Sequence, residues 1–192
     1  MQLKKKVLIV TAKWPYATKS TDGGDSTIKE IVRSLKNDYI VDMLCFRNDI
    51  DEQIKIDDVQ NIYFYYDDFA LFKNYQLHNE KKFLVRITQS EIAQKEIKKI
   101  CQNYEFIIVQ HVMFILDMED EKELLDKIVL YPMFTGSSYL KSGEMVPQIY
   151  LNKEKNVLNL VKLIISPSDV EKNILVEDYG VDKDRIIVVP RA

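Results

Sequence analysis

The segment AKWPYATKSTDGGDST, residues 12–27, contains a candidate site for a phosphate group. Gly23 and Gly24 stand directly before a stretch with helical periodicity, and Asp25 follows them. Backbone N–H groups at the start of a helix, together with the positive end of the helix dipole, suit a phosphate. Neither G-x-G-x-x-G nor the Walker A spacing is present, so the segment carries no dinucleotide or P-loop signature.

The same segment contains two aromatic residues, Trp14 and Tyr16. An aromatic ring beside a phosphate site can stack on a sugar ring, and it can equally pack the loop against the rest of the domain. The sequence leaves both alternatives open.

A second segment, PMFTGSSYLKSGEMVP at residues 132–147, is rich in hydroxyl groups. A polyhydroxylated ligand needs many hydrogen-bond donors and acceptors but little charge, and this composition matches that need. The alternative is an ordinary polar loop. The polar candidates are Thr135, Ser137, Ser138, Tyr139, Ser142 and Glu144.

His111 directly follows the apolar run Phe106–Gln110 and is one of two histidines in the chain. Because imidazole titrates near neutral pH, a histidine at the end of a strand can act as an acid, a base or a ligand-binding group. We expect a ligand contact, with a core role as the alternative. No cluster of His, Cys, Asp and Glu has the spacing of a metal site, and no nucleophile–His–Asp set is evident, so the sequence predicts no metal.

Short apolar runs alternate along the chain with stretches whose apolar residues recur at helical spacing. The strands and helices that these patterns predict must position the candidate residues. Such alternation predicts parallel strands joined by crossover helices, which is an α/β, Rossmann-like, doubly wound and mostly parallel sheet with helices on both faces. Helical stripes are expected around Ile28–Leu35, from near Asn79 to Tyr104, and from Gln148 to Lys162. The expected strands are Val7–Thr11, Tyr39–Cys45, Ile62–Tyr66, Phe106–Gln110, Ile128–Tyr131, Leu163–Ser166 and Ile186–Val189.

Glycines and prolines indicate which edge of this sheet binds ligands. Four of the five glycines, Gly23, Gly24, Gly136 and Gly143, lie in the two candidate segments, and several prolines follow strands closely. In open α/β sheets, ligands bind outside the carboxyl ends of the strands. Both candidate segments leave that edge, so we expect the site there, with simple turn formation as the alternative for the glycines.

The last stretch, IISPSDVEKNILVEDYGVDKDRIIVVPRA, predicts a strand, a capped helix, a glycine stop and a second strand. Ser168 has the N-cap position, with Glu171 placed to close a capping box. Val170 belongs to the apolar face of this helix, and Gly180 fits the left-handed position after it. The all-apolar run Ile186–Val189 is typical of a strand buried on both faces of a parallel sheet.

Composition narrows the class of protein. The 192 residues fit one globular domain, and a net charge of -3 argues against nucleic-acid binding as the main role. No apolar run is long enough to span a bilayer, and no signal peptide is evident. Cys45 and Cys101 lie in apolar contexts, so we expect buried thiols in a reducing cytoplasm rather than a disulfide.

The order of these motifs resembles the amino-terminal domain of GT-B glycosyltransferases, most closely the retaining family 4. The resemblance rests on KVLIVT, the GG pair before a helix, FIIVQH, and IISPSDVEKNIL followed by YGVDKDRIIVVP. It covers essentially the whole chain and is strongest in the last thirty or so residues. It implies an acceptor-binding domain over residues 1–189 and the start of an interdomain linker at residues 190–192, with the donor-binding domain absent from this chain.

The resemblance also implies roles for single residues. Gly23, Gly24 and Asp25 match the loop that lies against the phosphates of the donor. Family members commonly place a histidine where this chain has Met133, so either His111 replaces it as a catalytic residue or the donor contact differs. Acceptor binding is expected from Trp14, Tyr16, Met133, Thr135, Ser137, Ser138, Tyr139 and Glu144.

In the family, a sugar passes from a nucleotide-sugar donor to a glycan or lipid-linked acceptor in polysaccharide or glycolipid synthesis. The nucleotide sugar is a co-substrate, and neither a resident cofactor nor a metal is expected. The resemblance implies a cytoplasmic enzyme with weak peripheral contact at the inner membrane face, and the isolated fragment is expected to be inactive. The alternative is a non-catalytic Rossmann-like binding module, or a separately encoded subunit that pairs with a donor-binding partner.

Overall fold

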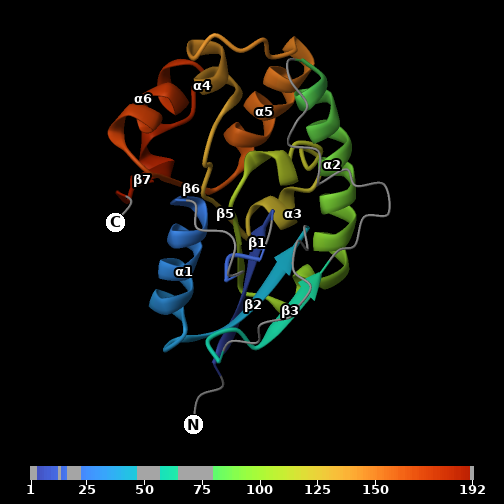
Figure 1. Cartoon of the computed structure of the whole chain (residues 1–192), viewed down its shortest axis with the longest axis vertical. Helices are drawn as coiled ribbons and strands as arrows, with labels where there is room; N and C mark the ends of the chain where they lie inside the picture. Colours follow the sequence, from blue (N-terminus) through green and yellow to red (C-terminus); the bar gives the residue numbers. More distant parts are fainter. Residues whose placement is uncertain (1–3, 13, 17–22, 47–56, 65–79, 191–192) are drawn as a thin grey trace.

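Seven parallel strands form one twisted sheet in the computed structural model of the chain, which describes residues 4–12, 14–16, 23–46, 57–64 and 80–190 (Figure 1). The strand order is β3-β2-β1-β4-β5-β6-β7, and every neighbouring pair is parallel. The predicted Rossmann-like α/β class is therefore confirmed. The strands are β1 Lys5–Thr11, β2 Tyr39–Cys45, β3 Asn61–Phe64, β4 Phe106–Val109, β5 Ile128–Leu130, β6 Leu163–Ser166 and β7 Ile186–Val188.

Helices cover both faces of the sheet, as expected from the alternating pattern. Helix α1 packs on one face, and α2, α3, α5 and α6 pack on the other (Figure 1). The helices are α1 Gly23–Leu35, α2 Glu80–Ile100, α3 Lys122–Leu125, α4 Gly136–Lys141, α5 Gln148–Leu160 and α6 Asp169–Glu177. Three short 3-10 turns complete the described structure: η1 Cys101–Asn103, η2 Val112–Phe114 and η3 Lys183–Arg185.

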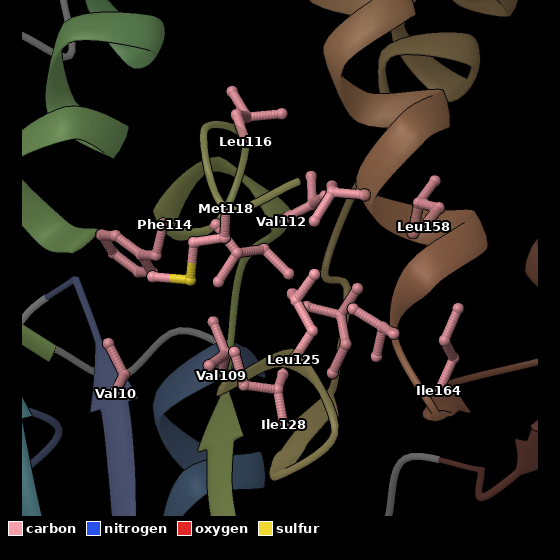
Figure 2. Packing of buried hydrophobic residues seen from close by; sticks show 14 of the residues in the cluster. Val10, Val109, Val112, Phe114, Leu116, Met118, Leu125, Ile128, Leu158 and Ile164 are labelled. Carbon is pink, nitrogen blue, oxygen red and sulfur yellow. The ribbon is translucent and has the colours of Figure 1, made fainter. Parts of the chain in front are cut away.

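The central strand β1 explains why the sheet needs two helical layers. Val7 and Ile9 pack into the apolar cluster on the α1 side, whereas Leu8 and Val10 pack into the larger cluster on the opposite side. All four side chains are fully buried, so the strand reads as a continuous apolar run. Figure 2 shows the larger cluster, in which strand residues such as Val10 and Val109 face the η2 and α5 regions.

The cap predicted for the helix in the last stretch is confirmed, with one difference. The Ser168 hydroxyl accepts a hydrogen bond from the Glu171 backbone N–H at 3.2 Å, and Gly180 has a φ of 71° after the helix. The Glu171 carboxylate, however, accepts a hydrogen bond from Ser138 on α4 instead of turning back to close the capping box. The prediction that Val170 belongs to the apolar face of this helix is wrong: it is 69% exposed in the first turn of α6, whereas Ile174 and Leu175 are buried.

The prediction that the last strand is buried on both faces is wrong. Strand β7 is the edge of the sheet, paired only with β6. Ile186 is buried on the α6 side, whereas Ile187 and Val189 are 51% and 47% exposed. An all-apolar run predicts burial on both faces only where helices cover both, and the apolar cluster beneath α1 includes residues of β1, β2 and β4 but none of β7.

Two of the predicted segments extend beyond the residues that the structure describes. Pro190 is described, but Arg191 and Ala192 of the predicted linker lie outside the described residues, as does the end of the expected strand Ile62–Tyr66 beyond Phe64. Within the described part of the chain, none of the helices combines the length and the apolar character that crossing a bilayer requires.

Candidate functional site

The sheet reverses its strand order between β1 and β4, and this topological switch point is where open α/β sheets bind ligands. Two buried polar side chains lie there, Thr11 as the last residue of β1 and Gln110 directly after β4, with exposed fractions of 1% and 5%. The Thr11 hydroxyl donates a hydrogen bond to Gln110 Oε1 at 2.5 Å. Neither residue was expected in the site, although a polar residue closing each of two neighbouring apolar strands is a visible signal in the sequence.

Helix α1 begins at the same edge. Gly23 and Gly24 are its first two residues, so the glycine pair lies inside the first turn and not before the helix as predicted. Gly24 and Asp25 are buried there. The structure therefore places the three predicted phosphate-loop residues in the first turn of a helix, where the backbone N–H groups have no carbonyl partner within the helix.

The first turn of α1 and the Thr11–Gln110 pair lie on the same face of the sheet. Ile9 of β1 and Ile108 of β4 belong to the apolar cluster beneath α1. Because strand side chains alternate between faces, the residues two positions later, Thr11 and Gln110, lie on that face too. Two hydrogen-bonding elements distant in sequence thus come together at the switch point.

His111 follows Gln110 and begins the turn η2. Its backbone carbonyl accepts a hydrogen bond from the Phe114 N–H at 3.1 Å, and its half-buried imidazole lies edge-on to the Phe114 ring with centroids 6.0 Å apart. The structure places His111 at the switch-point edge, as predicted. Its catalytic role stays a prediction.

The two aromatic residues of the first segment pack beside α1. Trp14 is 1% exposed within the same apolar cluster, and its ring centroid lies 5.1 Å from that of Tyr16. Lys29 Nζ lies 5.5 Å from the Tyr16 ring, and burial raises the pKa of Tyr16 to about 12. Trp14 packs the segment against the domain in this structure, and sugar stacking by the two rings stays a prediction.

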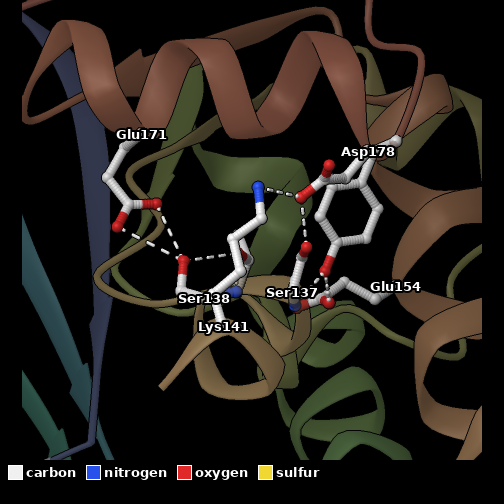
Figure 3. A network of polar contacts seen from close by, with 8 residues as sticks. Ser137, Ser138, Lys141, Glu154, Glu171 and Asp178 are labelled. Atoms are coloured by element: carbon white, nitrogen blue, oxygen red, sulfur yellow. Dashed lines mark hydrogen bonds and ion pairs between the residues drawn. The ribbon is translucent and has the colours of Figure 1, made fainter. Parts of the chain in front are cut away.

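The hydroxyl-rich segment contains a short helix, α4, where the sequence suggested only a loop. Thr135 caps it, because the Thr135 hydroxyl accepts a hydrogen bond from the Ser138 N–H at 3.3 Å. Ser137 Oγ donates to Asp178, and Ser138 Oγ donates to Glu171 at 3.1 Å (Figure 3). These hydroxyls hold α4 against α6, so they are engaged within the protein.

Glu154 of α5 lies at the centre of this network and was missed by the sequence analysis. Its side chain is 0% exposed, and its Oε2 accepts hydrogen bonds from the Gly136 N–H at 2.7 Å and from the Tyr179 hydroxyl (Figure 3). Its Oε1 has no hydrogen-bond partner in the described structure. The available signal was a glutamate inside the apolar stripe that joins Tyr150 to Val157.

Burial raises the pKa of Glu154 to about 7. The hydrogen bonds from Tyr179 and Gly136 and the charge of Arg86 oppose this shift, while the charge of Glu171 adds to it. On the neighbouring carboxylate, hydrogen bonds from Lys141 and Ser137 lower the pKa of Asp178. Glu154 is thus a carboxyl group that titrates near neutral pH where α4, α5 and α6 meet.

The remaining predicted acceptor residues face α2 or the core. Lys82 Nζ lies 4.1 Å from the ring centroid of Tyr139 and forms an ion pair with Glu144 at 2.8 Å. Arg86 donates a hydrogen bond to the Tyr139 hydroxyl at 3.2 Å. Met133, just after β5, is buried with 6% exposure.

The predicted site residues therefore form two groups. One group, at the switch point, comprises the α1 N terminus, the aromatic pair and His111, joined by the unpredicted Thr11 and Gln110. In the other, the hydrogen bonds, ion pairs and ring contacts of α4 and Glu144 run to α2, α5 and α6, and none among the described residues reaches the first group. A search of the same described ranges finds no cluster of His, Cys, Asp and Glu able to hold a metal ion.

Comparison with known proteins gives a fold relationship. No protein-family model and no curated protein matches the chain. Among solved structures, the crystal structure of a glycosyltransferase from Rickettsia africae ESF-5 matches with a TM-score of 0.51 and 17% sequence identity. The chain shares its fold with part of a glycosyltransferase. The match covers 98% of this chain and 43% of that one, so the chain spans less than half of the structure that it resembles.

At this identity the likeness shows the fold and no more. It supports the Rossmann-like lobe inferred from the strand pattern. The assignment to family 4, the retaining reaction and the residue roles are proposals.

Proposed function

We propose that the chain is the acceptor-binding half of a glycosyltransferase that moves a sugar from a nucleotide-sugar donor to a glycan or lipid-linked acceptor, with retention at the anomeric carbon. The observation that carries the proposal is the fold match over 98% of the chain to 43% of a glycosyltransferase. The position of Gly23 and Gly24 at the N terminus of α1, beside the switch point, supports it.

In the proposed reaction, the first turn of α1 faces the diphosphate of the donor. The backbone N–H groups of this turn and the helix dipole stabilise the negative charge that develops as the diphosphate leaves, which is electrostatic catalysis by preorganised groups. His111, at the same edge, is the proposed side chain near the transferred sugar. The nucleotide itself binds to a second lobe, and the acceptor binds along the edge that includes α4.

A substitution in the glycine pair tests the phosphate role. In an enzyme that contains this lobe together with a donor-binding lobe, we expect Gly24→Val to abolish transfer, because a branched side chain at a buried helix start blocks close approach of phosphate. Initial rates with a radiolabelled nucleotide sugar measure the effect. Ser34→Val, on the exposed part of the same helix, is the control and should keep its rate. Near-normal transfer by Gly24→Val would remove the phosphate assignment.

A non-catalytic binding module or a separately encoded subunit is the second candidate function. It is favoured by the coverage of 43%, which such a module or subunit fits as well as one lobe of a longer enzyme does. Affinity purification of the tagged chain from its native cells separates the alternatives. Recovery of a donor-binding protein that restores transfer supports the subunit. Recovery of the chain within one longer polypeptide supports the two-lobed enzyme.

A further inference from the structure

The carboxyl group of Glu154 holds the first turn of α4 against α5 (Figure 3). Its Oε2 accepts a hydrogen bond from the Gly136 N–H at 2.7 Å and another from the Tyr179 hydroxyl. The Tyr179 hydroxyl in turn accepts a hydrogen bond from the Ser137 N–H at 2.7 Å. Two successive backbone donors of α4 are therefore satisfied by one carboxyl oxygen, the first directly and the second through Tyr179.

This carboxyl group is sealed from water. Glu154 is 0% exposed, and a Cβ added to Gly136 would lie 2.7 Å from Oε2, so no further atom fits between α4 and that oxygen. Its Oε1 has no hydrogen-bond partner, and no cation in the described part of the chain donates to either oxygen. Because a buried carboxylate is costly unless it is paired and fully hydrogen-bonded, ionisation favours an arrangement in which α4 has moved and water solvates the charge.

The groups around Glu154 do not remove this cost. Burial, the largest effect, and the charge of Glu171 raise the pKa of Glu154 to about 7 against the charge of Arg86 and the two hydrogen bonds. Burial also raises the pKa of Tyr150 and of Tyr179, so both hydroxyls stay neutral. The charged and titratable groups that surround the carboxyl are Arg86 of α2, Tyr139 and Lys141 of α4, Tyr150 of α5, Glu171 of α6, and Asp178 and Tyr179 directly after α6.

Helix α4 can leave α5 without disturbing the sheet. It follows β5 and contributes no strand to the ladder. The ion pair of Lys141 with Asp178 has side chains that are 52% and 29% exposed, so water can replace it at little cost. Gly143, which follows α4 with a φ of 88°, has no described atom within 4 Å of an added Cβ, so the turn after the helix is not packed against the domain. Such a peripheral element can open locally while the core stays folded.

We propose that Glu154 is a proton-operated switch on α4: the protonated carboxyl keeps α4 docked on α5, and the ionised carboxylate releases it. On release the proton passes to solvent, and the N–H groups of Gly136 and Ser137 bind water in place of the carboxyl and Tyr179. The release is a property of the chain alone, and under the proposed function it would free the edge proposed for the acceptor.

Hydrogen exchange on the ¹⁵N-labelled 192-residue chain tests the switch. With a pKa of 4.5 when α4 is open and about 7 when it is docked, the equilibrium constant for opening should rise about thirtyfold between pH 5.5 and pH 8. The exchange rates of the Gly136 and Ser137 N–H groups, divided by their intrinsic rates, should rise by that factor. They should not respond to low urea, since local opening exposes little surface. The N–H of Ile107 in β4 should exchange more slowly at both pH values and should respond to urea.

Two variants assign the effect to the carboxyl. Glu154→Gln keeps an accepting oxygen but does not ionise, so the corrected exchange at Gly136 and Ser137 should not depend on pH. It retains both histidines, which also titrate in this range. Glu177→Gln, exposed on α6, is the matched control and should keep the thirtyfold change.

Two results would overturn the switch. If the chemical shift of the Gly136 N–H titrates while its protection stays constant, Glu154 ionises with α4 still docked. If a urea-dependent rise is shared by Gly136 and Ile107, the proton acts on global unfolding alone. Both results come from the wild-type chain, so they decide the matter even where Glu154→Gln does not fold, and neither bears on the phosphate site proposed at α1.

Discussion

The carboxyl group of Glu154 is buried where α4, α5 and Tyr179 meet, and its protonation links pH to stability. In the unfolded chain the ordinary pKa of 4.5 applies, whereas burial raises the pKa of the folded state to about 7. The folded state therefore holds this proton more tightly. The stability that the neutral form contributes is fully present below about pH 4.5 and is lost as the pH rises through about 7.

We expect Glu154→Gln to remove this pH dependence, because the amide keeps the shape and an accepting oxygen but does not ionise. Between pH 5.5 and pH 8 the wild type should lose on the order of 2 kcal/mol of unfolding free energy through this group, and the variant should not. Urea unfolding at the two pH values gives the difference. Glu177→Gln, exposed on α6, is the matched control and should retain the wild-type slope. Equal slopes in the wild type and Glu154→Gln would contradict the assignment.

At the scale of elements, α4 docks on α5 through close backbone approach. A Cβ added to Gly136 would meet Glu154 Oε2 and Leu151 Cδ2, both at 2.7 Å, so a larger residue there requires these side chains or α4 itself to shift. The helix is further held to α6 by Ser137, Ser138 and the ion pair of Lys141 with Asp178 at 2.7 Å. Because α4 follows β5, these contacts hold it at the carboxyl edge of the sheet.

Gly136→Ala should destabilise the protein by about 1–3 kcal/mol, since the methyl group forces α4 away from α5. Gly180→Ala is the contrasting variant: no atom lies within 4 Å of the added Cβ, but the φ of 71° is strained for alanine and should cost about 1 kcal/mol. Thermal and urea unfolding measure both. Hydrogen exchange at residues 136–141 should accelerate in Gly136→Ala only. Exchange that accelerates equally in both variants would show that α4 does not depend on the close approach.

The whole molecule corresponds to less than half of the glycosyltransferase whose fold it shares. Under the proposed function, the groups that bind the nucleotide belong to a second lobe. We expect the 192-residue chain alone to transfer no sugar, because a phosphate-facing helix cannot by itself hold the donor in a reactive geometry.

Product formation from a panel of radiolabelled nucleotide sugars and glycan or lipid-linked acceptors measures this expectation. The positive control is a complete two-lobed glycosyltransferase assayed with its own donor and acceptor. Robust turnover by the chain alone, sensitive to Gly24→Val, would contradict the assignment of acceptor binding to this lobe and nucleotide binding to a second lobe. It would place the whole catalytic site within these residues.

The sequence by itself determined the elements and their local ends. The strands Tyr39–Cys45 and Leu163–Ser166 match the structure residue for residue, because apolar β-branched runs between polar segments define buried parallel strands. The cap at Ser168 and the left-handed Gly180 were equally predictable, since each depends on contacts within a few residues. The expectation that the site lies at the carboxyl edge also followed from the order of the elements, and it stays a prediction.

Tertiary structure alone decided what depends on distant neighbours. Strand order makes β7 an edge and exposes Ile187, although its sequence resembles a central strand. It also pairs Thr11 with Gln110, 99 residues apart, and separates the α4 hydroxyls from the α1 helix start. Periodicity reports which residues are apolar, but burial, pKa and hydrogen-bond partners are set by groups far along the chain, so no local pattern encodes them.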